Sequence, residues 1–455
     1  MLFKRGKLAD GKDVREEDLR VSEGKIVETG SDLSPRAGER VYDLEGCYLL
    51  PGIIDSHTHF SLEARGAVSD DDPRAGGMSA LFGGVTTVID YADFLPDRPL
   101  PESIAARQKV FSTCPVDYQF QLVLNNNFQR DRLAELEQLA ALGITSLKLF
   151  TTYPEVGYML AEDLWPDILN TCKEIGLLVT VHAEDNALVE ERTENYRKAG
   201  LLGFDYHPRH RPAASEVEAV KWLVGMVEET RCPLYIVHMS TAGAAEVLAR
   251  ARARGLPLLG ETAPHYLLLE ESLFEHPGAA RYIMTPPLRR GSDQERLWQG
   301  LARGEIDVVA TDHCAFTAER KMEAENVLEV LPGIPGVETL LPLIYTYGVG
   351  RKRFSLPRLI QVLSENPARI FGLYPRKGSL EEGSDADLVV YDPDPRWHLQ
   401  DEDLHSRAGY SPFSGLELKG RVRLTMLRGE IKVEEGEFVG RDSGGRLITG
   451  RRIQD

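Results

Sequence analysis

The sequence has few cysteines, fewer basic than acidic residues, and no long apolar run. Its five cysteines are scattered without a C-x-x-C pair, which argues against a disulfide framework and favours a reducing, cytoplasmic compartment. No apolar run approaches the ~20 residues that a membrane span needs, and the opening M-L-F-K-R-G-K-L lacks the apolar region of a signal peptide. The net charge of -18 opposes binding to nucleic acid and to anionic membranes. We therefore expect a cytoplasmic protein that binds neither of them.

Short β-rich runs, by contrast, recur along the chain and alternate with helical, charge-bearing segments. Hydrophobic residues make up 42% of the 455 residues, enough for a sizeable core. There are eight β-rich runs, at residues 48–54, 85–90, 118–124, 144–150, 177–182, 234–238, 256–261 and 307–312. Eight strands that alternate with helices predict an α/β fold, the (β/α)8 TIM barrel.

The two ends of the chain have a different pattern, with short strands separated by turn residues. Residues 1–48 and 378–455 both show it, so we expect them to form one small β-sandwich module beside a catalytic barrel at 49–377. The last dozen residues, D-S-G-G-R-L-I-T-G-R-R-I, are expected to form a loose or partner-bound tail.

Six residues with metal-binding or catalytic chemistry fall on the predicted barrel strands, at or near their ends. Because the carboxyl ends of barrel strands share one face, these side chains should converge. Singly, each has a simpler explanation: a structural histidine, a lysine in an ion pair, or an aspartate that caps a turn. Their common position at strand ends favours a joint metal site, and the six residues are His57, His59, Lys148, His182, His238 and Asp312.

The residue types suit a centre with two divalent metal ions. Imidazole and carboxylate are ligands for zinc and similar ions, and zinc is the metal that we expect. Two ions need a bridging anion, and Lys148 in the apolar run S-L-K-L-F can provide it. A neutral lysine amine takes up carbon dioxide to form a carbamate, which turns a costly buried cation into an anionic ligand.

Several motifs then mark a family resemblance over nearly the whole chain. P-G-I-I-D-S-H-T-H-F, S-L-K-L-F-T-T-Y, V-H-A-E-D, V-H-M-S-T and T-D-H-C-A-F resemble the ordered signature of the cyclic amidohydrolases. The resemblance implies that His57, His59 and Asp312 bind one metal, that His182 and His238 bind the other, and that carboxylated Lys148 bridges them with a hydroxide. It also implies that the hydroxide attacks a ring amide, with Asp312 as proton shuttle and Tyr153 as hydrogen-bond donor.

Within that family the sequence is most similar to the D-hydantoinases and dihydropyrimidinases. Tyr153 follows Lys148 by five residues, and T-P-P-L-R and G-I-P-G-V-E resemble their substrate loops. The resemblance implies opening of a hydantoin or dihydropyrimidine ring to an N-carbamoyl amino acid, by a homo-oligomer (dimer or tetramer). Substrate contacts would come from Tyr153, from the main chain at Thr285 and Pro332, and from an apolar wall of Leu62, Phe94, Phe150 and Tyr158.

Three alternatives stay open. A-G-Y-S-P-F-S-G near Tyr410 slightly favours a resemblance to allantoinases, but their N-E-P-G-R is missing. Dihydroorotase is less favoured, because Phe60 and Ser61 stand where H-x-H-x-R places a carboxylate-binding arginine. A non-catalytic scaffold, as in inactive relatives of the dihydropyrimidinases, would have lost the ligand residues, which are complete here. The 317–331 segment differs from the usual hydantoinase sequence.

Overall fold

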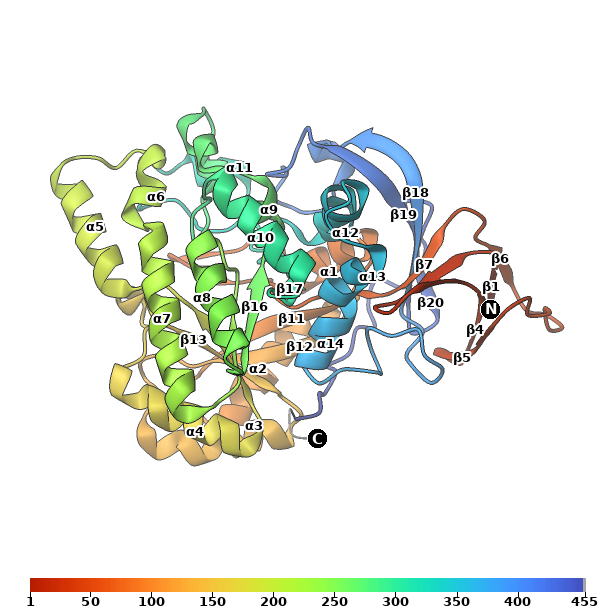
Figure 1. Cartoon of the computed structure of the whole chain (residues 1–455), viewed down its shortest axis with the longest axis horizontal. Coiled ribbons are helices and arrows are strands. Elements are labelled where there is room, and N and C mark those ends of the chain that lie inside the picture. The colour runs from red at the N-terminus through yellow and green to blue at the C-terminus, as the bar shows by residue number, and fades with distance from the viewer. Residues whose placement is uncertain (453–455) are drawn as a thin grey trace.

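A computed structural model describes residues 1–452 and contains an eight-stranded parallel sheet that curves into a barrel (Figure 1). Neighbours in the sheet follow chain order throughout. After the first and last strands, Thr58 pairs in parallel with His313, and the Thr311 N–H donates to Asp55 Oδ1 at 3.0 Å. These contacts join the two edges. The strands are β8 (Ile53–Asp55), β11 (Val85–Asp93), β12 (Asp117–Val123), β13 (Ser146–Phe150), β14 (Leu178–His182), β15 (Leu234–Ile236), β16 (Leu258–Thr262) and β17 (Val308–Val309).

Helices surround this sheet because their apolar faces cover the outside of the strands. In α7 (Ala213–Thr230), for example, Val220, Leu223 and Val227 recur at helical spacing and are all buried. No helix within residues 1–452 is long and apolar enough to cross a membrane. The other helices are α1 (Pro73–Phe82), α2 (Leu100–Val110), α3 (Leu136–Ala141), α4 (Trp165–Ile175), α5 (Asn186–Lys198), α6 (His207–His210), α8 (Ala242–Ala253), α9 (Pro264–Leu268), α10 (Gly291–Arg303), α11 (Ala318–Met322), α12 (Leu340–Ile344), α13 (Leu356–Ile360) and α14 (Asn366–Ile370).

Both chain ends contribute strands to a separate β module beside the barrel, at the right of Figure 1. Its larger sheet has the order β21-β20-β19-β18-β7-β2-β3, and its smaller sheet has the order β5-β4-β1-β6. A core of its own, with Phe3, Leu19, Leu388 and Met426, lies between these strands. The strands are β1 (Leu2–Lys4), β2 (Lys7–Ala9), β3 (Val14–Glu16), β4 (Asp18–Ser22), β5 (Lys25–Gly30), β6 (Val41–Asp43), β7 (Tyr48–Pro51), β18 (Leu388–His398), β19 (Glu417–Leu427), β20 (Glu430–Glu434) and β21 (Glu437–Phe438).

The barrel and the two-ended β module confirm the predicted fold class, but the first predicted strand is in fact two strands. β7 pairs with β18 in the module, whereas β8 pairs with β11 in the barrel. Gly52 separates them, and a Cβ at this position would lie 2.1 Å from Thr86 Oγ1, so the chain passes where a larger residue does not fit. The domain limits at residues 48 and 378 stay predictions.

The C-terminal segment is ordered against the barrel, so the expectation of a loose tail is wrong for residues 442–452. The Tyr118 N–H donates to the Arg446 carbonyl at 2.9 Å, and the Ile448 N–H donates back to Tyr118 at 2.8 Å. The Ile448 side chain is buried. These bonds pair the segment in parallel with the amino end of β12, opposite the predicted site. Residue 453, the last of the predicted dozen, lies outside the described residues.

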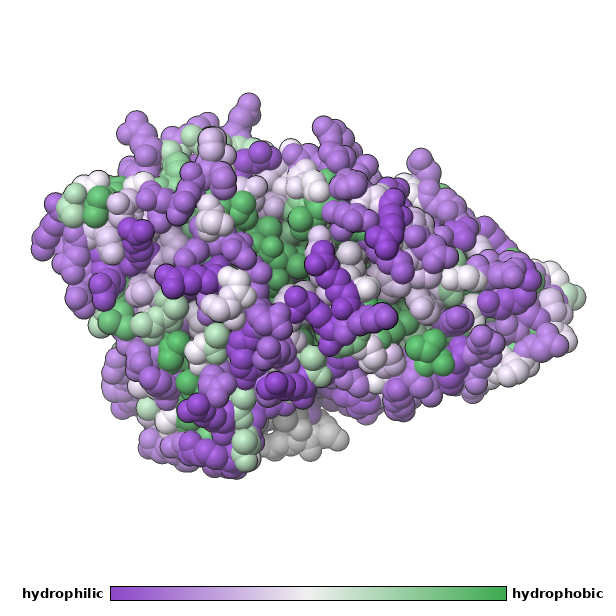
Figure 2. All heavy atoms as spheres, turned by 45° about the horizontal axis from the view of Figure 1, so that its top comes forward, coloured by the Kyte–Doolittle hydropathy of each residue, from purple (hydrophilic) through white to green (hydrophobic). Residues whose placement is uncertain are grey.

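The face of the molecule in Figure 2 is mostly hydrophilic, and hydrophobic residues gather near its centre. All five cysteines are buried and free.

Candidate metal centre and substrate pocket

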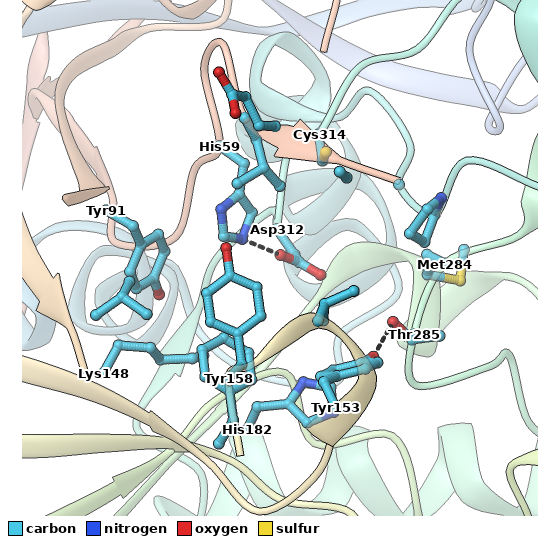
Figure 3. A pocket seen from close by; sticks show the side chains of 18 of the residues that line it. His59, Tyr91, Lys148, Tyr153, Tyr158, His182, Met284, Thr285, Asp312 and Cys314 are labelled. Carbon is cyan, nitrogen blue, oxygen red and sulfur yellow. Dashed lines mark hydrogen bonds and ion pairs between the residues drawn. The ribbon is translucent and has the colours of Figure 1, made fainter. Parts of the chain in front are cut away.

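The carboxyl ends of the barrel strands surround a pocket of about 270 Å³ (Figure 3). All six residues predicted for the metal site line it, although they come from five different strands or the loops that follow them. Of the predicted substrate contacts, Leu62, Phe150, Tyr153, Tyr158, Thr285 and Pro332 also line it. The pocket therefore brings together residues that are up to 276 positions apart, from His57 to Gly333.

Two histidines and an aspartate converge on one side of the pocket. The Nε2 atoms of His57 and His59 lie 3.2 and 3.1 Å from Asp312 Oδ1. His57 Nδ1 lies 2.7 Å from Glu261 Oε1, so in the neutral ring this nitrogen carries the proton and Nε2 turns a lone pair toward the Asp312 carboxylate. Burial lowers the pKa of His57 and so disfavours a second ring proton. The His57 Nε2 lone pair and the Asp312 carboxylate are therefore two acceptors that face each other. A cation bound between them would remove their repulsion, and His57, His59 and Asp312 can hold a metal ion.

His182 and His238 form a second pair of neighbouring histidines in the pocket. His182 Nδ1 lies 2.9 Å from His238 Nε2, and burial lowers the pKa of both rings. The other ring nitrogen of His182 bonds to Glu184 at 2.7 Å, and Arg211 holds the same carboxylate at 2.6 Å. His238 Nδ1 is buried without a hydrogen-bond partner in residues 1–452. Two imidazole nitrogens that face each other at this distance also fit ligation of a cation.

Lys148 points into the pocket from β13 and is 1% exposed. Its Nζ lies 5.3 Å from the ring centre of Tyr91 and 5.2 Å from that of Phe150. No carboxylate within residues 1–452 forms an ion pair with it, contrary to the simpler explanation for a lysine on a barrel strand. Burial lowers the pKa of Lys148 to about 7, against the opposing effect of Glu261 and Asp312. Much of the amine is therefore neutral near pH 7.

Tyr153 lies on the loop after β13 and closes the other side of the pocket. Its backbone is left-handed (φ 70°), which turns the chain so that the phenol reaches across the pocket. The hydroxyl donates to Thr285 Oγ1 at 2.6 Å, and the Arg211 guanidinium lies 4.8 Å from the ring centre. Burial raises the pKa of Tyr153 to about 12, so the phenol stays protonated and able to donate at neutral pH.

One predicted wall residue, Phe94, is not in the pocket. Its side chain packs in the core against Phe128, with ring centres 5.6 Å apart. The reason is strand alternation: Asp93 faces the pocket, so the next side chain points to the opposite face. Phe150 and Tyr158 do line the pocket and stack with ring centres 4.9 Å apart.

Several polar residues of the site were not predicted from the sequence. Arg65, Asp93 and Glu155 line the pocket, and Tyr91 lies beneath Lys148. Glu261, the partner of His57, ends the seventh predicted β-run, and this position was the signal that could have identified it. Asp93, Arg65 and Glu155 lie on strand ends and loops where the sequence carries no comparable pattern.

The chain can be assigned to a protein family by comparison with known proteins. Residues 48–432 match the model of the Amidohydrolase family, and the chain belongs to this family. It is 36% identical over 453 residues to the D-phenylhydantoinase of Escherichia coli O1:K1 / APEC, covering 98% of this chain and 97% of that protein. It is also similar to the crystal structure of dihydropyrimidinase from Brevibacillus agri NCHU1002 (TM-score 0.96, 32% identity, 99% of both chains). A D-hydantoinase from Thermus sp. matches with a TM-score of 0.95 and 33% identity over 100% of both chains. The predicted resemblance is confirmed.

Proposed function

We propose that this protein hydrolyses a cyclic amide and opens a hydantoin or dihydropyrimidine ring to an N-carbamoyl amino acid. The observation that carries the proposal is the complete set of four histidines, a buried lysine and an aspartate around one pocket. A non-catalytic scaffold has no need for an unpaired lysine in its barrel or for histidine lone pairs that face a carboxylate. The relatives named for hydantoin and dihydropyrimidine hydrolysis support this substrate class.

In this proposal His57, His59 and Asp312 would hold one zinc ion, and His182 and His238 would hold a second. The neutral amine of Lys148 would add to carbon dioxide and lose a proton, and the resulting carbamate would supply an anionic ligand to the pair. When bound, such a metal pair supplies a hydroxide nucleophile at neutral pH and polarises the substrate carbonyl.

The protein's own groups handle the protons and hold the substrate. Burial opposes ionisation of Asp312, but the neighbouring His57, His59 and His238 lower its pKa, so the group is an ionised carboxylate at neutral pH. It takes the proton of the attacking water and delivers it to the ring nitrogen that leaves. The Tyr153 hydroxyl donates to the carbonyl oxygen as negative charge develops there. Leu62, Phe150 and Tyr158 surround the ring substituent.

The residues that distinguish the two alternatives in the sequence, Phe60, Ser61 and Tyr410, do not line the pocket. The allantoinase-like motif near Tyr410 lies elsewhere: Tyr410 is buried, and its hydroxyl donates to the Arg281 carbonyl at 2.9 Å. Phe60 follows His59, where the sequence begins to differ from the dihydroorotase motif H-x-H-x-R, and it is fully buried in the core. We therefore place hydantoins and dihydropyrimidines ahead of allantoin and dihydroorotate.

A turnover screen with elemental analysis of the purified protein tests the proposal. We expect two metals per chain and ring opening of hydantoin, 5-substituted hydantoins or dihydrouracil, with little activity on dihydroorotate. Efficient hydrolysis of dihydroorotate without activity on uncharged rings would contradict the substrate class. Absence of bound metal together with absence of turnover would favour the scaffold.

We also propose a cytoplasmic homo-oligomer, a dimer or a tetramer, whose partner molecule is the small cyclic substrate. Five buried free cysteines support a reducing compartment. Light scattering of the purified protein measures the oligomeric state, and a monomer at the concentration used in the activity assay would contradict the proposed dimer or tetramer.

A further inference from the structure

Lys321 is a fully buried lysine behind one wall of the pocket. It lies on α11, within the 317–331 segment, and is 0% exposed. Its Nζ donates hydrogen bonds to the carbonyl oxygens of Ile283, at 2.7 Å, and Gly333. No carboxylate of the described chain forms an ion pair with it, and burial lowers the pKa of Lys321 to about 7. Burying a lysine without a charged partner is costly, so its position between two main-chain carbonyls calls for an explanation.

The two carbonyl groups belong to the two main-chain segments that form this wall. Met284 and Thr285 directly follow Ile283, and Pro332 directly precedes Gly333. Ile283 does not line the pocket, whereas the other four residues do. The labelled side chains of Met284, Thr285 and Cys314 lie on one side of the pocket in Figure 3. The Gly333 N–H also donates to the Ile283 carbonyl at 3.1 Å. Lys321 therefore adds a second link between the same two segments.

Other buried side chains fix the remainder of the first segment. His207 Nε2 donates to the Met284 carbonyl at 2.8 Å, and the Tyr266 hydroxyl donates to the Pro286 carbonyl at 2.6 Å. Burial lowers the pKa of His207 to about 3, so the ring is a neutral donor. The main chain on both sides of Thr285 is thus anchored, and both the Gly333 N–H and Lys321 link it to the second segment.

We propose that Lys321 is a positioning residue for substrate binding, which sets the distance between the main chain at Met284–Thr285 and at Pro332–Gly333. The inference rests on the proposed function, in which these segments hold the ring through main-chain atoms. Lys321 contacts neither the predicted metal ligands nor Tyr153, so its loss should weaken substrate binding more than it slows turnover of bound substrate.

Lys321→Met keeps most of the side-chain length and removes the donors. The matched control is Lys432→Met, because Lys432 is also a buried lysine that donates to a main-chain carbonyl, that of Arg441 at 3.1 Å, but in the β module. We expect Lys321→Met to raise KM about 10- to 100-fold, as small displacements in a binding site can, with a much smaller change in kcat and unchanged metal content. The control should leave KM unchanged. A parent-like KM in folded, metal-loaded Lys321→Met, or an equal rise in KM in the control, would overturn the proposal.

Hydrogen–deuterium exchange separates this inference from the proposed function. Amides of residues 283–285 and 333–334 should exchange faster in Lys321→Met than in the parent or in Lys432→Met, whichever ring the enzyme opens. Unchanged exchange would overturn the positioning role even if no cyclic amide is hydrolysed. If Lys321→Met does not fold, Lys321→Ala is assayed with n-propylammonium, which restores the missing ammonium. KM should fall relative to tetramethylammonium at equal ionic strength, and equal KM values would count against the proposal.

Discussion

Replacing Tyr153 with phenylalanine removes one hydroxyl from the pocket and leaves the ring in place. In the structure this hydroxyl donates to Thr285 Oγ1 at 2.6 Å. Because burial raises its pKa to about 12, the phenol remains a donor over the whole neutral range. We expect its hydrogen to turn from Thr285 to the substrate carbonyl oxygen as that oxygen becomes anionic, so the bond gains strength in the transition state.

The size of the effect distinguishes this role from a structural one. Loss of one oxyanion donor costs about 10²–10³-fold in kcat, or roughly 2.7–4 kcal/mol. If the hydroxyl only held Thr285 in place, its loss would remove an ordinary hydrogen bond worth about 0.5–1.5 kcal/mol. Since ~1.4 kcal/mol corresponds to a factor of ten, that loss would stay near or below tenfold.

Steady-state kinetics on hydantoin and dihydrouracil, with metal content measured on the same samples, decide between the two. Tyr158→Phe is the matched control, because its hydroxyl also faces the pocket but bonds to Asp93 at 3.3 Å. We expect Tyr153→Phe to lower kcat more than it changes KM, with both metals retained, and Tyr158→Phe to leave kcat nearly unchanged. Parent-like turnover by Tyr153→Phe with both metals bound would make the tyrosine a packing residue, and allantoinase would become the better interpretation.

Three further predictions concern the metal centre and the β module. Lys148→Ala should lose bound metal and turnover together, and a variant with two metals per chain and normal turnover would exclude the bridging role. Asp312→Asn still offers an oxygen but carries no proton, so metal should largely remain while turnover is lost; near-normal kcat would exclude the proton shuttle. In the module, Lys377 and Lys25 outweigh burial and lower the pKa of Asp385 to about 2 from 3.8. Its stabilising effect is therefore complete above pH 4 and is lost as the pH falls toward about 2. Asp385→Asn should flatten the fall of the melting temperature over that range, and an unchanged slope would contradict this assignment.

The barrel is predictable from the sequence because each βα unit carries its own local pattern. β14 and β16, for instance, lie within two residues of the predicted runs 177–182 and 256–261. Once the strands are placed, barrel topology brings their carboxyl ends together, and the six predicted metal-site residues reach one pocket without any contact having to be foreseen.

Features that depend on contacts between distant segments are not predictable in this way. The pattern of residues 48–54 is uniformly apolar, and only the pairing of Leu49 with Val390 assigns its first half to the module. The phase of alternation at the end of β11 decides that Asp93, and not Phe94, faces the pocket. The C-terminal segment looks polar and glycine-rich, yet main-chain bonds to Tyr118 order it.

The single glycine between β7 and β8 has a consequence for how the molecule can be divided. β7 is a central strand of the module, and His57 comes only two residues after the end of β8. One continuous stretch of backbone thus carries hydrogen bonds of the outer sheet and, a few residues on, a predicted metal ligand. Loss of pairing in the module would free the chain that sets the position of His57. We therefore expect the two parts to unfold in one cooperative transition, and we expect that deleting the module will not leave a working minimal barrel.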